Sequence, residues 1–263
     1  METRVVSVRD GMFQAHVSQG GSGEPLLFLH GSGGLHQGEY LDLLAQRFTV
    51  YAPSHPGFGA SEGIDHIDDI IDFALYYHDL MDELGIESAH VVGHSLGGML
   101  AAEIAALCPH RVRRLVLTNP VGLWRDEEPV LDFFTLSPDQ LMPHIWHDPE
   151  SEAVSEAFPK PEGKDAMVEA LFQRMQSYAS AGKFLWPIPD RGLKRRLHRI
   201  QSPTLIVWGE SDRLVPPSYA EDFRSRIKDS QVVILPECAH MPMFEKRDEF
   251  VALVTDFLNG DGR

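Results

Sequence analysis

The chain of 263 residues is 43% hydrophobic and 24% charged, which is the composition of an ordinary globular protein. Its 39 Asp and Glu outnumber its 23 Lys and Arg and give a formal net charge of −16. That charge would repel nucleic-acid phosphates and anionic membrane surfaces, so we expect neither as a partner. The length favours one domain with an insertion over two independent domains.

Cysteine usage and apolar content bear on the cellular compartment. Cys108 and Cys238 are the two cysteines, and they match neither a metal-ligand spacing nor a disulfide framework. The first residues lack the apolar stretch of a signal peptide, and no apolar run approaches the ~18 residues that indicate a membrane span. We therefore expect a cytoplasmic protein.

The order of apolar patterns predicts an α/β fold. Apolar residues alternate over 5–8 and 13–17 around an Asp10-Gly11 turn signal, which indicates a β-hairpin. Six short apolar runs then alternate with helical patterns, as in a parallel sheet covered by helices on both faces. The six runs are Leu26–Leu29, Thr49–Ala52, His90–Gly93, Leu115–Thr118, Leu205–Trp208 and Val232–Leu235. The sequence thus predicts a mostly parallel sheet of eight strands.

Helical periodicity is clearest over Ile67–Leu84, Leu96–Leu107 and Phe250–Leu258. The rhythm breaks between the sixth and seventh strands, where Val121–Ile200 contains eight prolines. Proline interrupts helices, so this segment predicts a helical cap, or lid, made of short helices. We therefore expect a core domain formed by residues 1–120 and 201–263, with residues 121–200 inserted as the cap.

The strongest local signal is the Gly-His-Ser-Leu-Gly-Gly segment at 93–98, between an apolar run and a helical pattern. This G-x-S-x-G pattern suits a sharp strand-to-helix turn, where glycines make room and the serine hydroxyl projects above the sheet. The pattern also occurs by chance, as a glycine turn beside a solvated serine. Its position between strand and helix favours Ser95 as a nucleophile.

The segment His-Gly-Ser-Gly-Gly at 30–34 follows the strand 26–29, and here the chain resembles the α/β-hydrolase superfamily. In that family the residue after His-Gly and the residue after the nucleophile donate backbone N–H groups to an oxyanion. The resemblance implies Ser32 and Leu96 for these roles, with Gly33 as the alternative donor. A glycine-rich loop suits this task because it lets the main chain approach a substrate.

The resemblance extends to the acid and the base, which follow the nucleophile in the family's order Ser, Asp, His. Asp212 lies just past the strand 205–208, in the loop that carries the family's acid, with Glu210 as the alternative carboxylate. His240 follows the strand 232–235, in the loop that carries the base. The implied triad is Ser95, Asp212 and His240, which needs no metal and no organic cofactor.

The cap composition favours a substrate that is uncharged and largely apolar. Between residues 121 and 190 the chain has thirteen Asp and Glu against five Lys and Arg, and it is rich in aromatic residues and Met. We expect a small-molecule carboxylic ester of small to medium size, hydrolysed through an acyl-enzyme. The candidate substrate-binding residues are Trp124, Phe133, Phe134, Trp146, Trp186, Met241 and Arg196.

Two other functions stay open. The chain also resembles meta-cleavage hydrolases, which cut a carbon-carbon bond of a dienoate, over 56–59 and 208–216, and Arg196 matches an arginine that they use near substrate. Those enzymes have Asn-Ser-Met at the elbow and a Trp after the histidine, whereas this chain has His94-Ser95-Leu96 and Met241. Arg196 also fits the solvated face of a helix. A non-catalytic ligand-binding protein on the same fold is the third possibility.

Overall fold

A computed structural model describes residues 1–260, and its centre is an eight-stranded sheet in the order β1-β2-β4-β3-β5-β6-β7-β8. The strands are β1 Glu2–Val8, β2 Phe13–Gly20, β3 Pro25–Leu29, β4 Thr49–Pro53, β5 Ala89–His94, β6 Val112–Thr118, β7 Thr204–Gly209 and β8 Ser230–Leu235. The β1-β2 and β2-β4 pairs are antiparallel and the other pairs are parallel. The predicted hairpin and the mostly parallel sheet are both confirmed.

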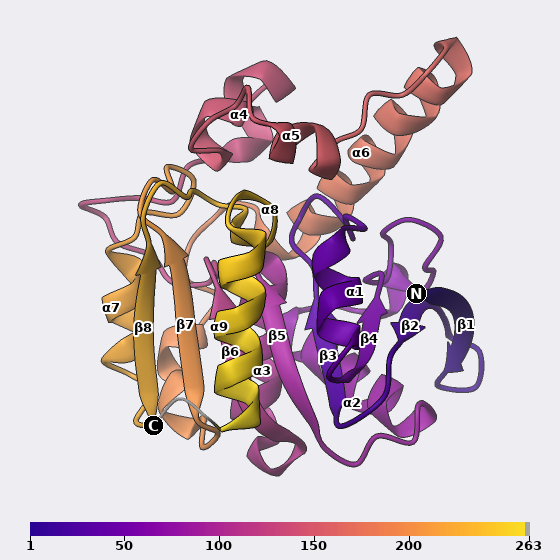
Figure 1. Ribbon diagram of the computed structural model, residues 1–263. Coiled ribbons are helices and arrows are strands. Elements are labelled where there is room, and N and C mark those ends of the chain that lie inside the picture. The colour runs from indigo at the N-terminus through magenta and orange to yellow at the C-terminus, as the bar shows by residue number, and fades with distance from the viewer. Residues whose placement is uncertain (261–263) are drawn as a thin grey trace.

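The central strands are buried because helices cover both faces of the sheet. All six residues of β5 and all six of β7 are buried, as their continuous apolar runs predict. Figure 1 shows α1 and α9 on the near face and α3 behind the sheet. The helices are α1 Glu39–Ala45, α2 Ile70–Glu83, α3 Leu96–Leu107, α4 Pro138–Ile145, α5 Glu152–Ala157, α6 Lys164–Leu185, α7 Tyr219–Arg224, α8 Pro242–Glu245 and α9 Arg247–Asn259.

The predicted helix over 67–84 begins three residues later than expected. The Asp69 side chain accepts hydrogen bonds from the N–H groups of Ile71 and Asp72, and this N-cap starts α2 at Ile70. No helix in the described part of the chain combines the length and the apolarity that crossing a bilayer requires.

Three α-helices, α4 to α6, lie between β6 and β7, in the segment predicted to form the cap. The expectation of short helices holds for α4 and α5 but is wrong for α6, which has 22 residues. No proline interrupts the chain between Pro161 and Pro187, so nothing ends this helix early. Figure 1 shows α4 and α5 above the tops of β7 and β8, whereas the N-terminal half of α6 projects away from the body.

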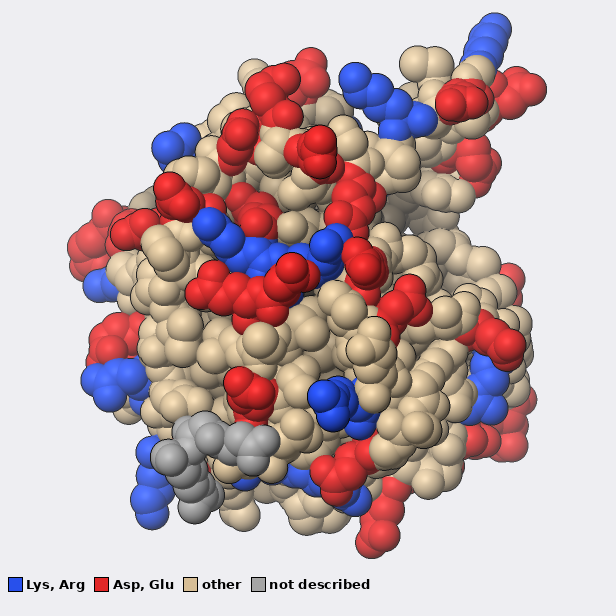
Figure 2. All heavy atoms as spheres, in the orientation of Figure 1, with Lys and Arg blue, Asp and Glu red and all other residues tan. Residues whose placement is uncertain are grey.

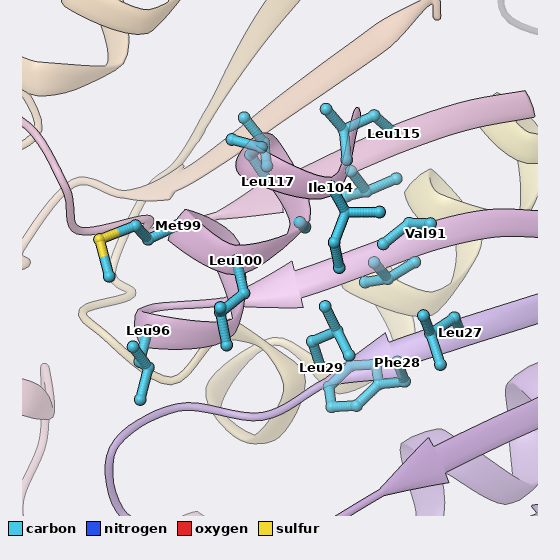
Figure 3. Packing of buried hydrophobic residues seen from close by; sticks show 14 of the residues in the cluster. Leu27, Phe28, Leu29, Val91, Leu96, Met99, Leu100, Ile104, Leu115 and Leu117 are labelled. Carbon is cyan, nitrogen blue, oxygen red and sulfur yellow. The ribbon is translucent and has the colours of Figure 1, made fainter. Parts of the chain in front are cut away.

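The core around α3 fixes the position of the segment that carries Ser95. Figure 3 shows Leu100 and Ile104 of α3 directed toward Leu29 of β3 and Val91 of β5. These four side chains are fully buried. The N-terminus of α3 is therefore held rigidly at the carboxyl ends of the central strands.

Candidate active site

Ser95 occupies a strained turn between β5 and α3. Its φ of 55° lies in the left-handed region, which is uncommon for a residue with a side chain. Its N–H donates to the Thr118 carbonyl (3.0 Å), and its own carbonyl accepts from Met99 (3.1 Å) and Val121 (3.2 Å). These bonds to α3 and to the end of β6 hold the turn in place.

Glycine is required on both sides of this turn. A Cβ at position 97 would lie 2.1 Å from the Leu29 carbonyl oxygen, and one at position 93 would lie 2.2 Å from the Gly97 carbonyl oxygen. Both distances are shorter than any tolerable contact, so only glycine lets α3 approach β3 and β5 this closely. The predicted strand-turn-helix geometry is present.

His240 and Asp212 are directly paired. The His240 Nδ1 lies 2.7 Å from Asp212 Oδ2, and both side chains are nearly fully buried. Asp212 Oδ1 accepts hydrogen bonds from the N–H groups of Leu214 (2.9 Å) and Val215 (3.0 Å). Because Nδ1 faces the carboxylate, Nε2 is the ring nitrogen left to exchange a proton with a nucleophile.

Asn119, which directly follows β6, is a residue of this site that sequence reasoning missed. Its Nδ2 donates to Asp212 Oδ2 (2.6 Å) and to the Ala239 carbonyl (3.2 Å). The sequence did offer one indication of its role, which is its position. A polar residue just past a parallel strand lies at the sheet edge where the carboxyl ends of the strands meet.

Glu245 of α8 was also missed, and it braces the loop that carries His240. Its Oε1 accepts from the N–H groups of Ala239 (2.9 Å) and Met241 (3.2 Å), on either side of the histidine. Its Oε2 accepts from the N–H of His147 (2.7 Å). Burial raises the pKa of Glu245.

The end of α4 is joined to both loops. The Ile145 carbonyl accepts from His240 N–H (3.0 Å), and the His144 carbonyl accepts from Arg213 N–H (3.1 Å). His147 Nδ1 also lies 2.8 Å from Ser211 Oγ. The end of α4 thus supports the loops that carry Asp212 and His240.

The glycine loop after β3 lies against the Ser95 turn. A Cβ at position 31 would lie 3.2 Å from the Ser95 Cβ, so the backbone here is in contact with the serine. Ser32 is buried, whereas Gly33 is exposed. Leu96 is the first residue of α3, so its N–H has no acceptor within the helix and remains available to a ligand.

Three buried histidines surround this loop. His55 N–H donates to His30 Nε2 (2.9 Å), and the His55 ring contacts the His30 carbonyl (2.8 Å) and the Tyr77 hydroxyl. Burial lowers the pKa of His55 to about 3 and places that of His30 well below its usual range. Burial and nearby His240 likewise lower the pKa of His94, whose Nε2 donates to the His240 carbonyl (2.8 Å). These rings are neutral structural elements at pH 7.

A family model described as the alpha/beta hydrolase family matches residues 26–253. The chain belongs to this family. A 2-hydroxy-6-oxo-6-phenylhexa-2,4-dienoate hydrolase of Burkholderia cepacia is 26% identical to this hydrolase over 94% of the chain and 91% of the relative. Lipase 3 of Moraxella sp. is 30% identical over 85% of the chain and 74% of the lipase. Relatives of this hydrolase thus include both a dienoate hydrolase and a lipase.

The fold of this hydrolase also matches solved structures. A meta-cleavage product hydrolase from Pseudomonas fluorescens superimposes with a TM-score of 0.79, covers 98% of each chain and is 22% identical. At that identity the match supports the eight-stranded fold with its helices.

The structure describes the surroundings of Arg196 and Trp186, two of the candidate substrate-binding residues of this hydrolase. Arg196 forms a two-point ion pair with Glu103 of α3 (2.6 and 2.7 Å), two helical turns, or roughly 12 Å, along the helix from Ser95. The predicted solvated helix around Arg196 is two short 3-10 turns, at Leu193–Arg195 and Leu197–Arg199. Trp186 is 56% exposed.

The remaining candidate residues lie in the cap or beside His240. Phe133 and Phe134 stack on one another at 4.2 Å between centroids, and both contact Tyr178 of α6 edge-on. Trp146 is packed between Phe158 and Phe244. Trp124 is half-buried and donates to Asp126, and Met241 is buried. The exposed apolar side chains on the projecting half of α6 are Met167, Val168, Leu171, Phe172 and Met175.

Proposed function

We propose that this protein is a serine hydrolase that cleaves carboxylic esters, with Ser95 as nucleophile, His240 as base and Asp212 as the acid that orients it. The observation that carries the proposal is the buried His240 to Asp212 contact of 2.7 Å, combined with the strained turn that presents Ser95. Nucleophile, base and orienting acid follow three parallel strands that end at the same sheet edge. That arrangement suits acyl transfer.

In the proposed reaction, Ser95 Oγ attacks the ester carbonyl carbon and its proton passes to His240 Nε2. The carbonyl oxygen becomes negative and accepts hydrogen bonds from the N–H groups of Ser32 and Leu96. The carbon-oxygen bond to the alcohol breaks, and the alcohol takes the proton from His240. Water then attacks the acyl-enzyme with His240 as base, which releases the acid and restores Ser95.

We propose an uncharged, largely apolar substrate of small to medium size. The Phe133, Phe134 and Tyr178 cluster provides an apolar cap surface. Figure 2 shows acidic side chains gathered over the cap helices α4 and α5. An anionic substrate would be repelled there, whereas a neutral ester would not. The lipase among the relatives agrees with an ester substrate.

Carbon-carbon hydrolysis of a dienoate is the second candidate, and a relative named as a dienoate hydrolase supports it. In a dienoate hydrolase of this kind, Arg196 would be the cation that binds the substrate carboxylate. Its guanidinium is occupied by Glu103 and by the Arg191 carbonyl. This pairing favours the ester over the anionic dienoate.

The test compares wild type with Ser95→Ala and, as a matched control, Ser202→Ala, which alters a buried serine two residues before β7. Hydrolysis of p-nitrophenyl acetate, butyrate and hexanoate is measured beside that of a meta-cleavage dienoate. We expect kcat to fall by several orders of magnitude in Ser95→Ala only, and kcat/KM to rise with acyl length by at most roughly fourfold per methylene. Residual Ser95→Ala activity within tenfold of wild type would reject the nucleophile. Faster turnover of the dienoate than of any ester would favour the second candidate.

The assignment of the acid is tested separately. Asp212→Asn should lower kcat severely, because the amide cannot fix the His240 tautomer as a carboxylate does. Glu210→Gln, which changes an exposed carboxylate two residues away, should leave kcat unchanged. A crippled Glu210→Gln enzyme beside an active Asp212→Asn enzyme would reverse the assignment.

A further inference from the structure

The Asn119 side chain connects the ends of three neighbouring strands. Asn119 follows β6, and its amide nitrogen contacts Asp212, in the loop after β7, and the Ala239 carbonyl, in the loop after β8. We propose that Asn119 is a positioning residue that holds the Asp212 carboxylate and the His240 loop in one orientation. This inference rests on the proposed roles of Asp212 and His240.

The contacts of Asp212 divide between its two oxygens. Among residues 1–260, Oδ1 accepts only from Leu214 and Val215, which belong to the same loop and move with it. Oδ2 accepts from His240 and from Asn119. Asn119 therefore links the Asp212 carboxylate to the rigid sheet, independently of the loop that carries Asp212. It does so at Oδ2, the oxygen that faces His240.

The conformation of Asn119 is unfavourable for a residue without a special role. Its φ of 44° lies in the left-handed region, and its side chain is fully buried. Its Oδ1 finds no hydrogen-bond partner among residues 1–260. An unpaired buried oxygen opposes folding, and such groups and left-handed non-glycine residues both concentrate at functional sites.

The chemistry of the amide suits the position. Asn119 donates a hydrogen bond to Asp212 Oδ2 without adding a charge, so it stabilises the carboxylate and leaves His240 with a single anionic partner. An aspartate in its place would set two carboxylates within hydrogen-bond distance, and such a pair resists double ionisation. The other titratable groups close to the pair are His94, Cys238 and Glu245.

The test uses two variants that tolerate a left-handed φ. Asn119→Gly removes the amide, and Asn119→Asp keeps its shape but replaces the donor with a carboxylate. Ser202→Ala is the control, because it changes another buried polar side chain, two residues before β7, that takes no part in the site. With p-nitrophenyl butyrate, kcat, KM and the pH profile of kcat/KM are measured, and circular dichroism checks folding.

We expect Asn119→Gly to lower kcat roughly 10- to 100-fold with KM within about twofold of wild type, since orientation is lost and substrate contacts are kept. The acidic limb of kcat/KM should move to higher pH, because a carboxylate without its amide donor attracts the protonated imidazole more strongly. Asn119→Asp should move that limb further in the same direction. Ser202→Ala should match wild type.

Several results would overturn the inference. Asn119→Gly with kcat within about threefold of wild type would do so, as would a loss of activity with an unmoved acidic limb, which a purely structural role would produce. If Asn119→Gly does not fold, the pH profile of Asn119→Asp tests the inference, and an unmoved acidic limb in that variant would overturn it. Activity that survives in Ser95→Ala rejects the proposed function itself. If activity requires Ser95 but the Asn119 variants keep the kcat of wild type, only the positioning role is rejected.

Discussion

The ion pair between Arg196 and Glu103 gives a prediction that separates a structural from a substrate-binding role. The Glu103 side chain is 1% exposed, and both of its oxygens are held by Arg196, whose side chain is 22% exposed. Burial raises the pKa of Glu103, and Arg196 opposes that rise. Arg196→Met keeps the aliphatic stem but leaves the buried carboxylate without its cation.

The expected cost follows from this geometry. Removing one partner of a buried ion pair costs about 3–5 kcal/mol of unfolding free energy. Partial exposure of Arg196 and the capacity of Glu103 to take up a proton reduce this to about 2–3 kcal/mol. For a domain of this size the melting temperature should fall by roughly 5–10 °C.

The assay is thermal and urea unfolding at pH 7.5 as a double-mutant cycle with Glu103→Leu, with Arg195→Met, an exposed neighbour, as control. The double variant should recover most of the lost stability, because no buried charge remains. The Arg196→Met penalty should shrink as pH falls toward 5. Without its cation Glu103 has a raised pKa, so the cost is present at high pH and disappears once the carboxyl is protonated.

An unchanged melting temperature in Arg196→Met would refute this reasoning. If KM for a dienoate also rose while KM for neutral esters stayed constant, Arg196 would be a substrate contact. The carbon-carbon hydrolase would then be the better proposal.

Two further predictions concern the glycine turn and acid stability. Gly97→Ala should lower kcat/KM at least about tenfold, because its Cβ would force Leu29 and the loop after β3 aside. Gly182→Ala is the control and should keep its activity, because the added Cβ meets only an ordinary contact. Equal activities of the two variants would contradict the tight-turn argument. Since the pKa of His55 is lowered to about 3 from an unfolded value of ~6.5, the unfolded state binds the extra proton between these values, and stability is lost as pH falls below ~6.5. Between pH 7.5 and 5, His55→Gln should lose about 2 kcal/mol less unfolding free energy than wild type. His110→Gln, which changes an exposed histidine, is the control and should lose as much as wild type. Identical losses in all three proteins would exclude His55 as the titrating group.

Local pattern was sufficient for most of the fold. The continuous apolar runs of β5 and β7 predicted buried parallel strands, and the Asp10-Gly11 signal predicted the hairpin. Motif context placed Ser95 at the end of a strand and at the start of a helix. These features depend on neighbours within a few residues, which is why a single sequence reveals them.

Tertiary structure decided which distant residues meet. Asn119 contacts Asp212, which is 93 residues away in the sequence, and the ion-paired residues Arg196 and Glu103 are also 93 residues apart. No periodicity predicts such contacts, so Asn119 went unnoticed and Arg196 was a candidate for the substrate site. The partner of a buried polar group is chosen by the need to satisfy hydrogen bonds and charge in a low-dielectric interior, and only the folded chain shows which groups are within reach.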